Sequence, residues 1–269
     1  MVNVRKEVYQ AFRNRYAIGC FNICNLENFQ AVLSASRRTK SSVFMATSNR
    51  TIEYMGIENI MNLSRGLKGS KVMLHLDHGD YRNAIKCINY GYPSVMFDGS
   101  MYNFKKNVNL TKKVADYAHK NKVFVEGEIG ALQKDGLTNP EEALNFVKQT
   151  GVDMLAISIG NEHGYYKYMP TIDIKRLMEI KDTVRIPLVL HGSSGIDDDT
   201  IRAVLKYNIA KVNVDTDLRW AYSYAISDFM RRHSLNKLDK DTFDIRNYSG
   251  LARNAFENKV VEKIKLFHP

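Results

Sequence analysis

Three histidines in the sequence follow short apolar runs of the kind that form buried strands: His78, His163 and His191. A neutral imidazole is a common zinc ligand, and three of them leave a further position for water or substrate, as in catalytic zinc sites. A single histidine is more often a structural or surface residue, but three at corresponding places favour a shared metal. We therefore predict that these side chains bind zinc or another divalent metal.

A carboxylate lies directly before the first of these histidines. Asp77 can carry a proton to or from a hydroxyl group at the metal, or it can orient a ligand from behind; proton transfer fits the chemistry better. Asp98 and Glu128 also stand at the ends of apolar runs, and they either hold a second metal position or brace the histidines. Glu126 points the same way as Glu128 along a strand, so one of these glutamates can be structural.

Small and polar residues at the ends of the last two runs suit a phosphate group. These residues are Gly192, Ser193, Ser194, Asn213, Val214, Asp215 and Thr216. Small residues let backbone N–H groups turn toward an anion, and the helix that follows favours negative charge at its start. Lys167 adds a cation nearby. We predict a phosphate site here, with two ordinary tight turns and a helix cap as the alternative.

Together these groups point to a reaction class. A divalent metal beside a bound phosphate can polarise a carbonyl and stabilise an enediolate, which suits carbon–carbon cleavage or isomerisation of a sugar phosphate. The net charge of +10 favours an anionic partner. The lysines and arginines are scattered, and no nucleic-acid-binding motif is present, so we expect a small sugar phosphate and not a nucleic acid.

The composition also bounds where the protein works. No run approaches the roughly 18 to 20 apolar residues that a membrane span needs, and the first residues do not resemble a signal peptide. Cys20, Cys24 and Cys87 have no metal-ligand spacing and give an odd count, which argues against a disulfide framework. We expect a cytoplasmic protein without membrane partners, in which Cys20 and Cys24 are small core residues.

The elements that must position these residues form a regular series. We expect eight strands, separated by roughly 20 to 33 residues, the size of a strand–helix unit. They are Ala17–Phe21, Ser42–Ala46, Val72–Leu76, Ser94–Phe97, Val123–Glu128, Met154–Ser158, Pro187–Leu190 and Ala210–Val214. Most are continuously apolar, as strands buried on both faces should be.

Helical patterns lie between the strands. Leu26–Arg37 has one apolar face, Thr138-Asn139-Pro140 opens a helix, and Asp197–Tyr207 is another. We expect Asn3–Arg13 to close the bottom of a barrel and the residues after 216 to form the eighth helix and a helical tail.

Eight such units predict a single domain over residues 1–269, of the α/β class, with a (β/α)8 TIM-barrel fold and a C-terminal helical tail. An open doubly wound sheet is the alternative, but no glycine-rich fingerprint follows the first strand. In a TIM barrel the carboxyl ends of the strands carry the chemistry. The residues above would therefore meet at one mouth, together with Asn22 and Ser48, which end the first two strands.

Five segments at these strand ends resemble the signature blocks of a known family. They are Leu74–Gly79, Val125–Gly130, Glu162–Gly164, Leu190–Gly195 and Lys211–Asp217. The resemblance is to the class II, zinc-dependent fructose-bisphosphate and tagatose-bisphosphate aldolases. It extends in order over nearly the whole chain, and the early Phe21-Asn22 and the late Phe243–Arg246 fit it as well.

The resemblance implies roles for the matching residues. His78, His163 and His191 would hold zinc, Asp77 would protonate the aldehyde oxygen, and Asp98 and Glu128 would match an outer metal position. The phosphate end of a ketose 1-phosphate or ketose bisphosphate would lie against Gly164, the turn at residues 192–194 and residues 213–216. The implied reaction joins or cleaves dihydroxyacetone phosphate and an aldehyde through a zinc-stabilised enediolate. Members of the family are dimers or larger, so a homodimer or homotetramer is expected.

One segment departs from the family pattern. The bisphosphate aldolases carry a long loop with a proton-transferring glutamate after the fifth strand, whereas here residues 131–137 lead almost directly into a helix. Asp135 is the only acid in this segment. It replaces the glutamate, or the base comes from elsewhere, or the reaction differs. Two hypotheses remain open: an aldolase with an altered acceptor, where Arg50 recognises a different group, and a family member that binds a sugar phosphate without aldolase turnover.

Overall fold

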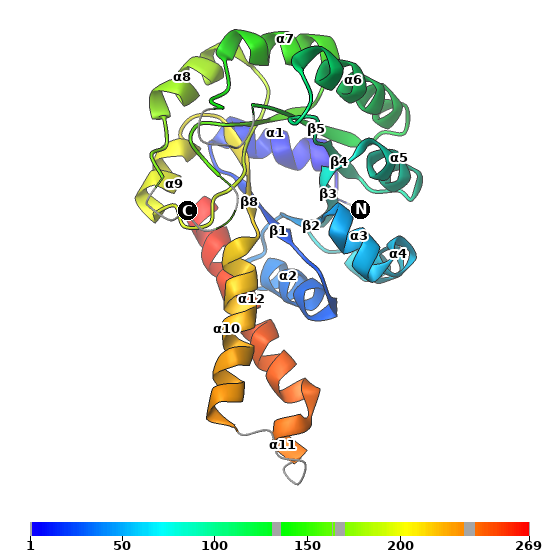
Figure 1. Cartoon of the computed structure of the whole chain (residues 1–269), viewed down its shortest axis with the longest axis vertical. Coiled ribbons are helices and arrows are strands. Elements are labelled where there is room, and N and C mark those ends of the chain that lie inside the picture. Colours follow the sequence, from blue (N-terminus) through cyan, green and yellow to red (C-terminus); the bar gives the residue numbers. More distant parts are fainter. Residues whose placement is uncertain (1, 131–135, 163, 165–169, 234–239, 269) are drawn as a thin grey trace.

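The computed structural model describes residues 2–130, 136–162, 164, 170–233 and 240–268. Eight parallel strands pair in chain order and close into a barrel surrounded by helices (Figure 1). The strands are β1 (Ile18–Asn22), β2 (Val43–Thr47), β3 (Val72–Gly79), β4 (Ser94–Phe97), β5 (Phe124–Ile129), β6 (Met154–Ile157), β7 (Leu188–Leu190) and β8 (Ile209–Val214). The predicted (β/α)8 barrel of the α/β class is confirmed.

The strand bounds agree with the prediction to within one residue, except in β3. The barrel closes where β8 pairs with β1, with Ile18 opposite Lys211 and Phe21 opposite Val214. The third strand continues three residues further than predicted, to Gly79. Asp77 and His78 therefore belong to the strand itself and do not follow it.

Most of the helices begin where the sequence supplies a capping side chain. They are α1 (Val4–Asn14), α2 (Leu26–Thr39), α3 (Asn49–Met55), α4 (Ile57–Ser64), α5 (Tyr81–Asn89), α6 (Phe104–Lys120), α7 (Pro140–Thr150), α8 (Ile174–Thr183), α9 (Asp198–Leu205), α10 (Thr216–Arg232), α11 (Lys240–Phe243) and α12 (Ile245–Phe267). In α7, Asn139 accepts hydrogen bonds from the N–H groups of Glu141 and Glu142, and Pro140 is the first helical residue. The predicted helix starts at residues 26, 138–140 and 197 are confirmed within two residues.

Two apolar layers form the core. The larger lies between the strands and the surrounding helices. The smaller fills the lower barrel, where Val4, Val8 and Ala11 of α1 pack against inward-facing residues such as Phe44 and Met154. This packing confirms that the first helix closes the bottom of the barrel. Above this layer, the barrel interior becomes polar and charged.

The helical tail is also confirmed, and it packs on the outside of the barrel. Figure 1 shows α10 and α12 running side by side and extending beyond the barrel, with α11 at the far end. α12 packs on α2 and β1, and the Ala17 N–H donates to the Phe267 carbonyl oxygen at 3.0 Å. The tail therefore covers the strand with which the barrel begins.

The predictions for the two early cysteines and for membrane-spanning helices can also be compared with the structure. Cys20 is buried as predicted, but Cys24 is exposed, because β1 ends at Asn22 and the chain turns outward before α2. Within the described part of the chain, no helix combines the length and apolar character that crossing a bilayer requires.

Candidate metal and phosphate site

The carboxyl ends of the strands surround a cavity of about 460 Å³. The predicted residues that line it are Asn22, Ser48, Asp77, His78, Asp98, Gly164, His191, Gly192, Ser193, Ser194, Asn213, Asp215 and Thr216. Glu128 lies beside His78, and Val214 is buried in β8. His163 and Lys167 fall outside the described residues, so their roles stay predictions.

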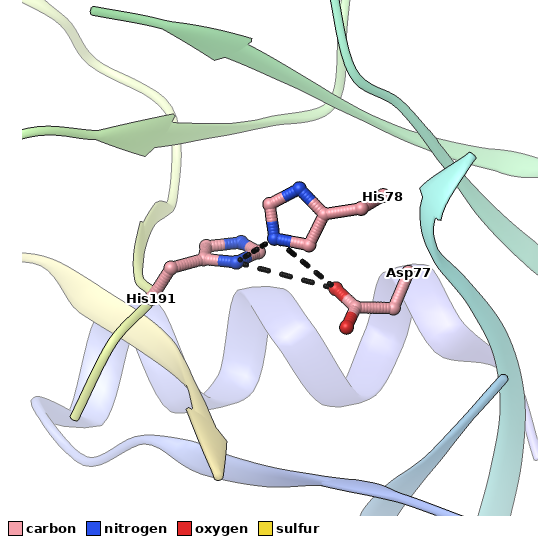
Figure 2. A group of neighbouring side chains, drawn as sticks. All are labelled: Asp77, His78 and His191. Carbon is pink, nitrogen blue, oxygen red and sulfur yellow. Dashed lines mark hydrogen bonds and ion pairs between the residues drawn. The ribbon is translucent and has the colours of Figure 1, made fainter. Parts of the chain in front are cut away.

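An unusual backbone conformation brings two consecutive residues of β3 into one site. Successive side chains of a strand normally point to opposite faces. His78 has a φ of +47°, in the left-handed region that residues other than glycine seldom enter. The pairing of β3 with β4 is irregular between Leu76 and Gly79. This irregularity lets Asp77 and His78 both point toward His191 (Figure 2).

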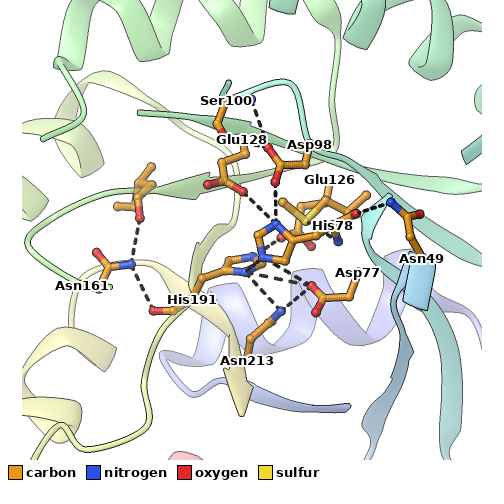
Figure 3. Close-up of polar contacts among 12 residues, drawn as sticks. Asn49, Asp77, His78, Asp98, Ser100, Glu126, Glu128, Asn161, His191 and Asn213 are labelled. Carbon is orange, nitrogen blue, oxygen red and sulfur yellow. Dashed lines mark hydrogen bonds and ion pairs between the residues drawn. The ribbon is translucent and has the colours of Figure 1, made fainter. Parts of the chain in front are cut away.

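The imidazoles of His78 and His191 each present one nitrogen to the same point. His78 Nε2 lies 2.9 Å from His191 Nδ1. On the far side of each ring a carboxylate is in contact: Glu126 lies 2.7 Å from His191 Nε2, and Asp98 lies 2.7 Å from His78 Nδ1. Both rings are therefore oriented by a carboxylate behind them (Figure 3).

The two carboxylates determine which ring nitrogens carry protons. Burial opposes the charge of Glu126, but Lys211 and the hydrogen bond from His191 hold its pKa well below the usual range. Burial also opposes the charge of Asp98, but its hydrogen bond with His78 lowers its pKa to about 2. Both groups are ionised near neutral pH and accept hydrogen bonds. His78 Nε2 and His191 Nδ1 are consequently the nitrogens available to a metal.

Two imidazole lone pairs repel each other at this separation, so a proton or a metal ion has to lie between them. Burial disfavours a charge on His78, yet Asp77, Asp98 and Glu128 raise its pKa to about 10. Burial lowers the pKa of His191. His78 therefore holds the proton in the metal-free protein, and a divalent cation would take the place of that proton.

Asp77 completes this group from the opposite side. Its Oδ1 lies 4.0 Å from both His78 Nε2 and His191 Nδ1. Two amides hold the carboxylate: Asn22 donates to Oδ2 at 2.7 Å and Asn213 donates to Oδ1 at 2.8 Å. Burial alone would raise the pKa of Asp77, but the neighbouring imidazoles and Lys211 lower it well below its usual range. Asp77 is an ionised, fixed carboxylate beside the point that the two imidazole nitrogens share.

A second group of possible ligands lies on the outer side of His78. The side chains of His78, Asp98 and Glu128 offer ligand atoms that lie within 4.8 Å of one another. Asp98 also accepts from the N–H and hydroxyl of Ser100. Burial and the charge of Asp98 raise the pKa of Glu128 to about 8. Asp98 thus braces His78, and the outer metal position remains a prediction that this geometry permits.

The predicted phosphate segments are joined to each other. Gly192 has a φ of +59°, and a Cβ there would lie 2.1 Å from the carbonyl oxygen of Glu162. The Ser193 hydroxyl donates to the Asn213 carbonyl oxygen at 2.6 Å, and Ser194 accepts from the Asp217 N–H at 3.1 Å. The turn after β7 is therefore fixed against the start of α10, the arrangement that the phosphate prediction requires.

Several residues at the site were missed by the sequence reasoning. Asn49 donates to the His78 carbonyl oxygen at 3.2 Å, and Asn161 donates to that of His191 at 3.0 Å. Arg219 lines the cavity and forms a 2.6 Å ion pair with Asp215. The spacing of four residues between Asp215 and Arg219 on one helix was an available signal. Asn49 is the first residue of α3 and Asn161 lies on a loop; neither carried such a signal.

Arginines of the cavity and of the helical tail have different partners. Arg50 lines the cavity, as its position after Ser48 suggested. Arg246 pairs with Asp244, and Arg253 contacts Gln30; neither lines the cavity.

Comparisons with known proteins define the class more closely. A barrel with imidazoles and carboxylates converging at the strand ends is an enzyme-type barrel. Residues 2–269 match the family model for "Fructose-bisphosphate aldolase class-II". A fructose-bisphosphate aldolase from Streptococcus pneumoniae is 37% identical, with 99% of this chain and 97% of that protein covered. One from Geobacillus stearothermophilus is 34% identical, with coverages of 99% and 96%.

A solved structure agrees with these matches. The YdjI aldolase from Escherichia coli K12 superposes with a TM-score of 0.87 at 30% identity, covering 100% of this chain and 97% of that one. The chain belongs to the class II fructose-bisphosphate aldolase family, and it is accordingly an aldolase, a type of lyase. The sequence match with the S. pneumoniae protein extends over 285 residues, more than the 269 of this chain, so that protein has residues without a counterpart here.

We expect His191→Ala to weaken zinc binding by about 100-fold or more, because it removes one of the two convergent nitrogens. Competition with a chromogenic chelator measures the affinity. His233→Ala is the matched control, because His233 is exposed and packs on Phe229 far from the cavity. An unchanged zinc affinity in His191→Ala would contradict the assignment of this nitrogen as a ligand.

We expect Gly192→Ala to lower the affinity for dihydroxyacetone phosphate about tenfold, because the new Cβ forces the turn away from Glu162. Titration calorimetry on the zinc-loaded protein measures the affinity. Gly250→Ala is the control, because a Cβ at this position in α12 meets nothing within 4 Å. Equal affinities in the wild type and Gly192→Ala would show that this turn does not contact the ligand.

Proposed function

We propose that this aldolase is a zinc-dependent enzyme acting on a ketose 1-phosphate or ketose bisphosphate. It would cleave the substrate to dihydroxyacetone phosphate and an aldehyde, and catalyse the reverse joining. The observation that carries this proposal is the convergence of His78 Nε2, His191 Nδ1 and the Asp77 carboxylate beside the turn at Gly192. The names of the relatives support a bisphosphate substrate.

The residues at the mouth fit a divalent metal. The donor set offers two imidazole nitrogens whose opposite nitrogens are hydrogen-bonded to ionised carboxylates, an arrangement that increases the basicity of a metal ligand. His163 is the predicted third ligand. When bound, a divalent cation would polarise the substrate carbonyl and stabilise the enediolate that remains after carbon–carbon cleavage.

Asp77 is placed to move the proton of the cleaved fragment. In the cleavage direction, its ionised carboxylate takes the proton from the hydroxyl group on the carbon that becomes the aldehyde. The carbon–carbon bond breaks, and its electron pair stays with the dihydroxyacetone phosphate fragment. In the joining direction, the same proton returns to the aldehyde oxygen. The Asn22 and Asn213 amides fix both carboxylate oxygens for this transfer.

The second proton transfer, at the donor carbon, belongs to another group. Asp135 is the acid in the shortened segment, and it lies outside the described residues. Arg50 adds positive charge to the mouth, which supports an acceptor aldehyde that carries an anionic group.

The resemblance to the aldolase family is also the basis for proposing an oligomeric state and a cellular location. We propose a homodimer or homotetramer in the cytoplasm. The exposed, stacked rings of Trp220 and Tyr224 on α10 support assembly, because large exposed aromatic side chains are typical of protein interfaces.

The first test is release of dihydroxyacetone phosphate from a panel of ketose 1-phosphates, 1,6-bisphosphates and 1,7-bisphosphates. A coupled reductase detects this product whatever the aldehyde. We expect release from at least one substrate, its loss with EDTA and its return with added zinc, because the cation would stabilise the enediolate. Binding of these compounds by the zinc-loaded protein without any release would contradict the proposal. It would support the alternative of a family member that binds a sugar phosphate without turnover.

We expect Asp77→Asn to lower kcat by about 10²- to 10⁴-fold with little change in KM, because an amide cannot accept the hydroxyl proton. The coupled assay with the best panel substrate measures both constants. Asp116→Asn is the control for loss of a carboxylate, since Asp116 lies on the surface of α6 and pairs with Lys112. A kcat within threefold of the wild type would exclude Asp77 as the proton-transferring group.

A further inference from the structure

A fully buried ammonium lies beneath the mouth of the barrel. Lys211 of β8 extends into the barrel interior, where its Nζ lies 2.8 Å from Glu126 Oε2 of β5 and 2.7 Å from Asn213 Oδ1. Burial disfavours the charge, but the surrounding Cys20, Glu126 and Asp77 raise the pKa of Lys211. The ammonium is therefore charged and donates to both oxygens.

Lys211 is connected through Glu126 to His191, a candidate metal ligand. The ammonium binds one oxygen of Glu126, and the other oxygen accepts from His191 Nε2 at 2.7 Å. An ammonium has only donors, so it balances the negative charge of the glutamate without competing for the imidazole proton. Lys211 thereby stabilises the ionised Glu126 that directs His191 Nδ1 to the metal position.

The other contact of Lys211 leads to Asp77. The two ends of an asparagine amide have nearly the same shape, so the neighbours decide which end points where. Only the oxygen of Asn213 can face an ammonium. The NH₂ group must then point the opposite way, where it donates to Asp77 Oδ1 at 2.8 Å (Figure 3). A flipped amide would place its oxygen against the carboxylate, which is repulsive.

Stability alone does not account for a charged pair at this place. Burying an ion pair costs desolvation free energy, and well-packed apolar residues of the same volume are often as stable or more so. The layer directly below is apolar. His75 lies 3.4 Å from Glu126, but burial and Lys211 lower its pKa, so it is neutral. Lys211 is therefore the cation that balances Glu126 within the described barrel interior.

We propose that Lys211 is a positioning residue of the aldolase reaction, holding Asp77 through Asn213 and His191 through Glu126. It does not touch the substrate. The inference rests on the proposed function, because it assigns Lys211 to the proton transfer and metal binding of that same site.

The test uses a charge-balanced variant, because Lys211→Met alone leaves Glu126 buried without its counter-charge. In Lys211→Met/Glu126→Gln, the glutamine oxygen still accepts from His191, but the Asn213 amide has no cation to orient it. We expect a folded protein that binds zinc about tenfold more weakly, because a neutral amide oxygen makes His191 less basic than a carboxylate does. At saturating zinc, kcat should be lower by about 10- to 100-fold and KM nearly unchanged. A kcat within threefold of the wild type would overturn the inference.

Two further variants distinguish a positioning role of Lys211 from a general loss of protein stability. Tyr92→Phe removes another buried polar contact, the 3.0 Å hydrogen bond to Thr47 outside the barrel interior, and should leave kcat unchanged. In an Asn213→Ala background, the double substitution should lower kcat by a smaller factor than in the wild type, because its route to Asp77 is already absent and only the route to His191 remains. A full additional loss in that background would overturn the route through Asn213.

A readout that needs no turnover distinguishes this inference from the proposed function. The side-chain ¹⁵N–¹H₂ resonances of Asn213 report the orientation and partners of the amide. They should move in Lys211→Met/Glu126→Gln and stay in place in Tyr92→Phe. If the wild type releases no dihydroxyacetone phosphate, the proposed reaction fails, and these resonances still decide whether Lys211 orients Asn213; resonances that do not move overturn the inference.

Discussion

The structure depends on two imidazole nitrogens that face each other at 2.9 Å. Such an arrangement needs a positive charge between the rings, as a proton or as a metal ion. The carboxylates behind the rings, Glu126 and Asp98, keep the opposite nitrogens protonated, and the Asp77 carboxylate lies across from both rings. These charged groups account for much of the polar interior of the barrel. Each ionised group needs its own partner to remain charged when buried.

The barrel interior has two levels, one apolar and one that contains the paired ionised groups. The lower level is apolar and is closed by Val4, Val8 and Ala11 of α1. The upper level contains Lys211 and Glu126, both fully buried. The lower level contributes stability through burial of apolar surface, so the upper level can carry groups whose burial is unfavourable. Position along each strand decides the level, because strands cross the barrel from its closed end to its open end.

Most of the fold and part of the site could be predicted from the sequence. Apolar strand patterns located all eight strands, and the residues at their ends located most of the cavity wall. The left-handed conformation of His78 could not be predicted, since it depends on irregular pairing with a neighbouring strand. The orientation of the Asn213 amide also could not, because it is decided by Lys211 and Asp77 together. Periodicity identifies faces of elements, whereas these features depend on contacts across the barrel.

The packing of α12 over β1 has a consequence for the synthesis of the protein. The strand that begins the barrel receives one neighbour, β2, early, but its other neighbour, β8, and its covering helix come much later in the chain. The contact between Ala17 and Phe267 joins residues 250 positions apart. On the ribosome, β1 therefore has an unpaired edge until all the intervening strands and then β8 have emerged. Unpaired strand edges favour aggregation, so the nascent chain is most exposed to misassociation, and most in need of chaperone protection, before β8 emerges; α12 covers β1 only after that.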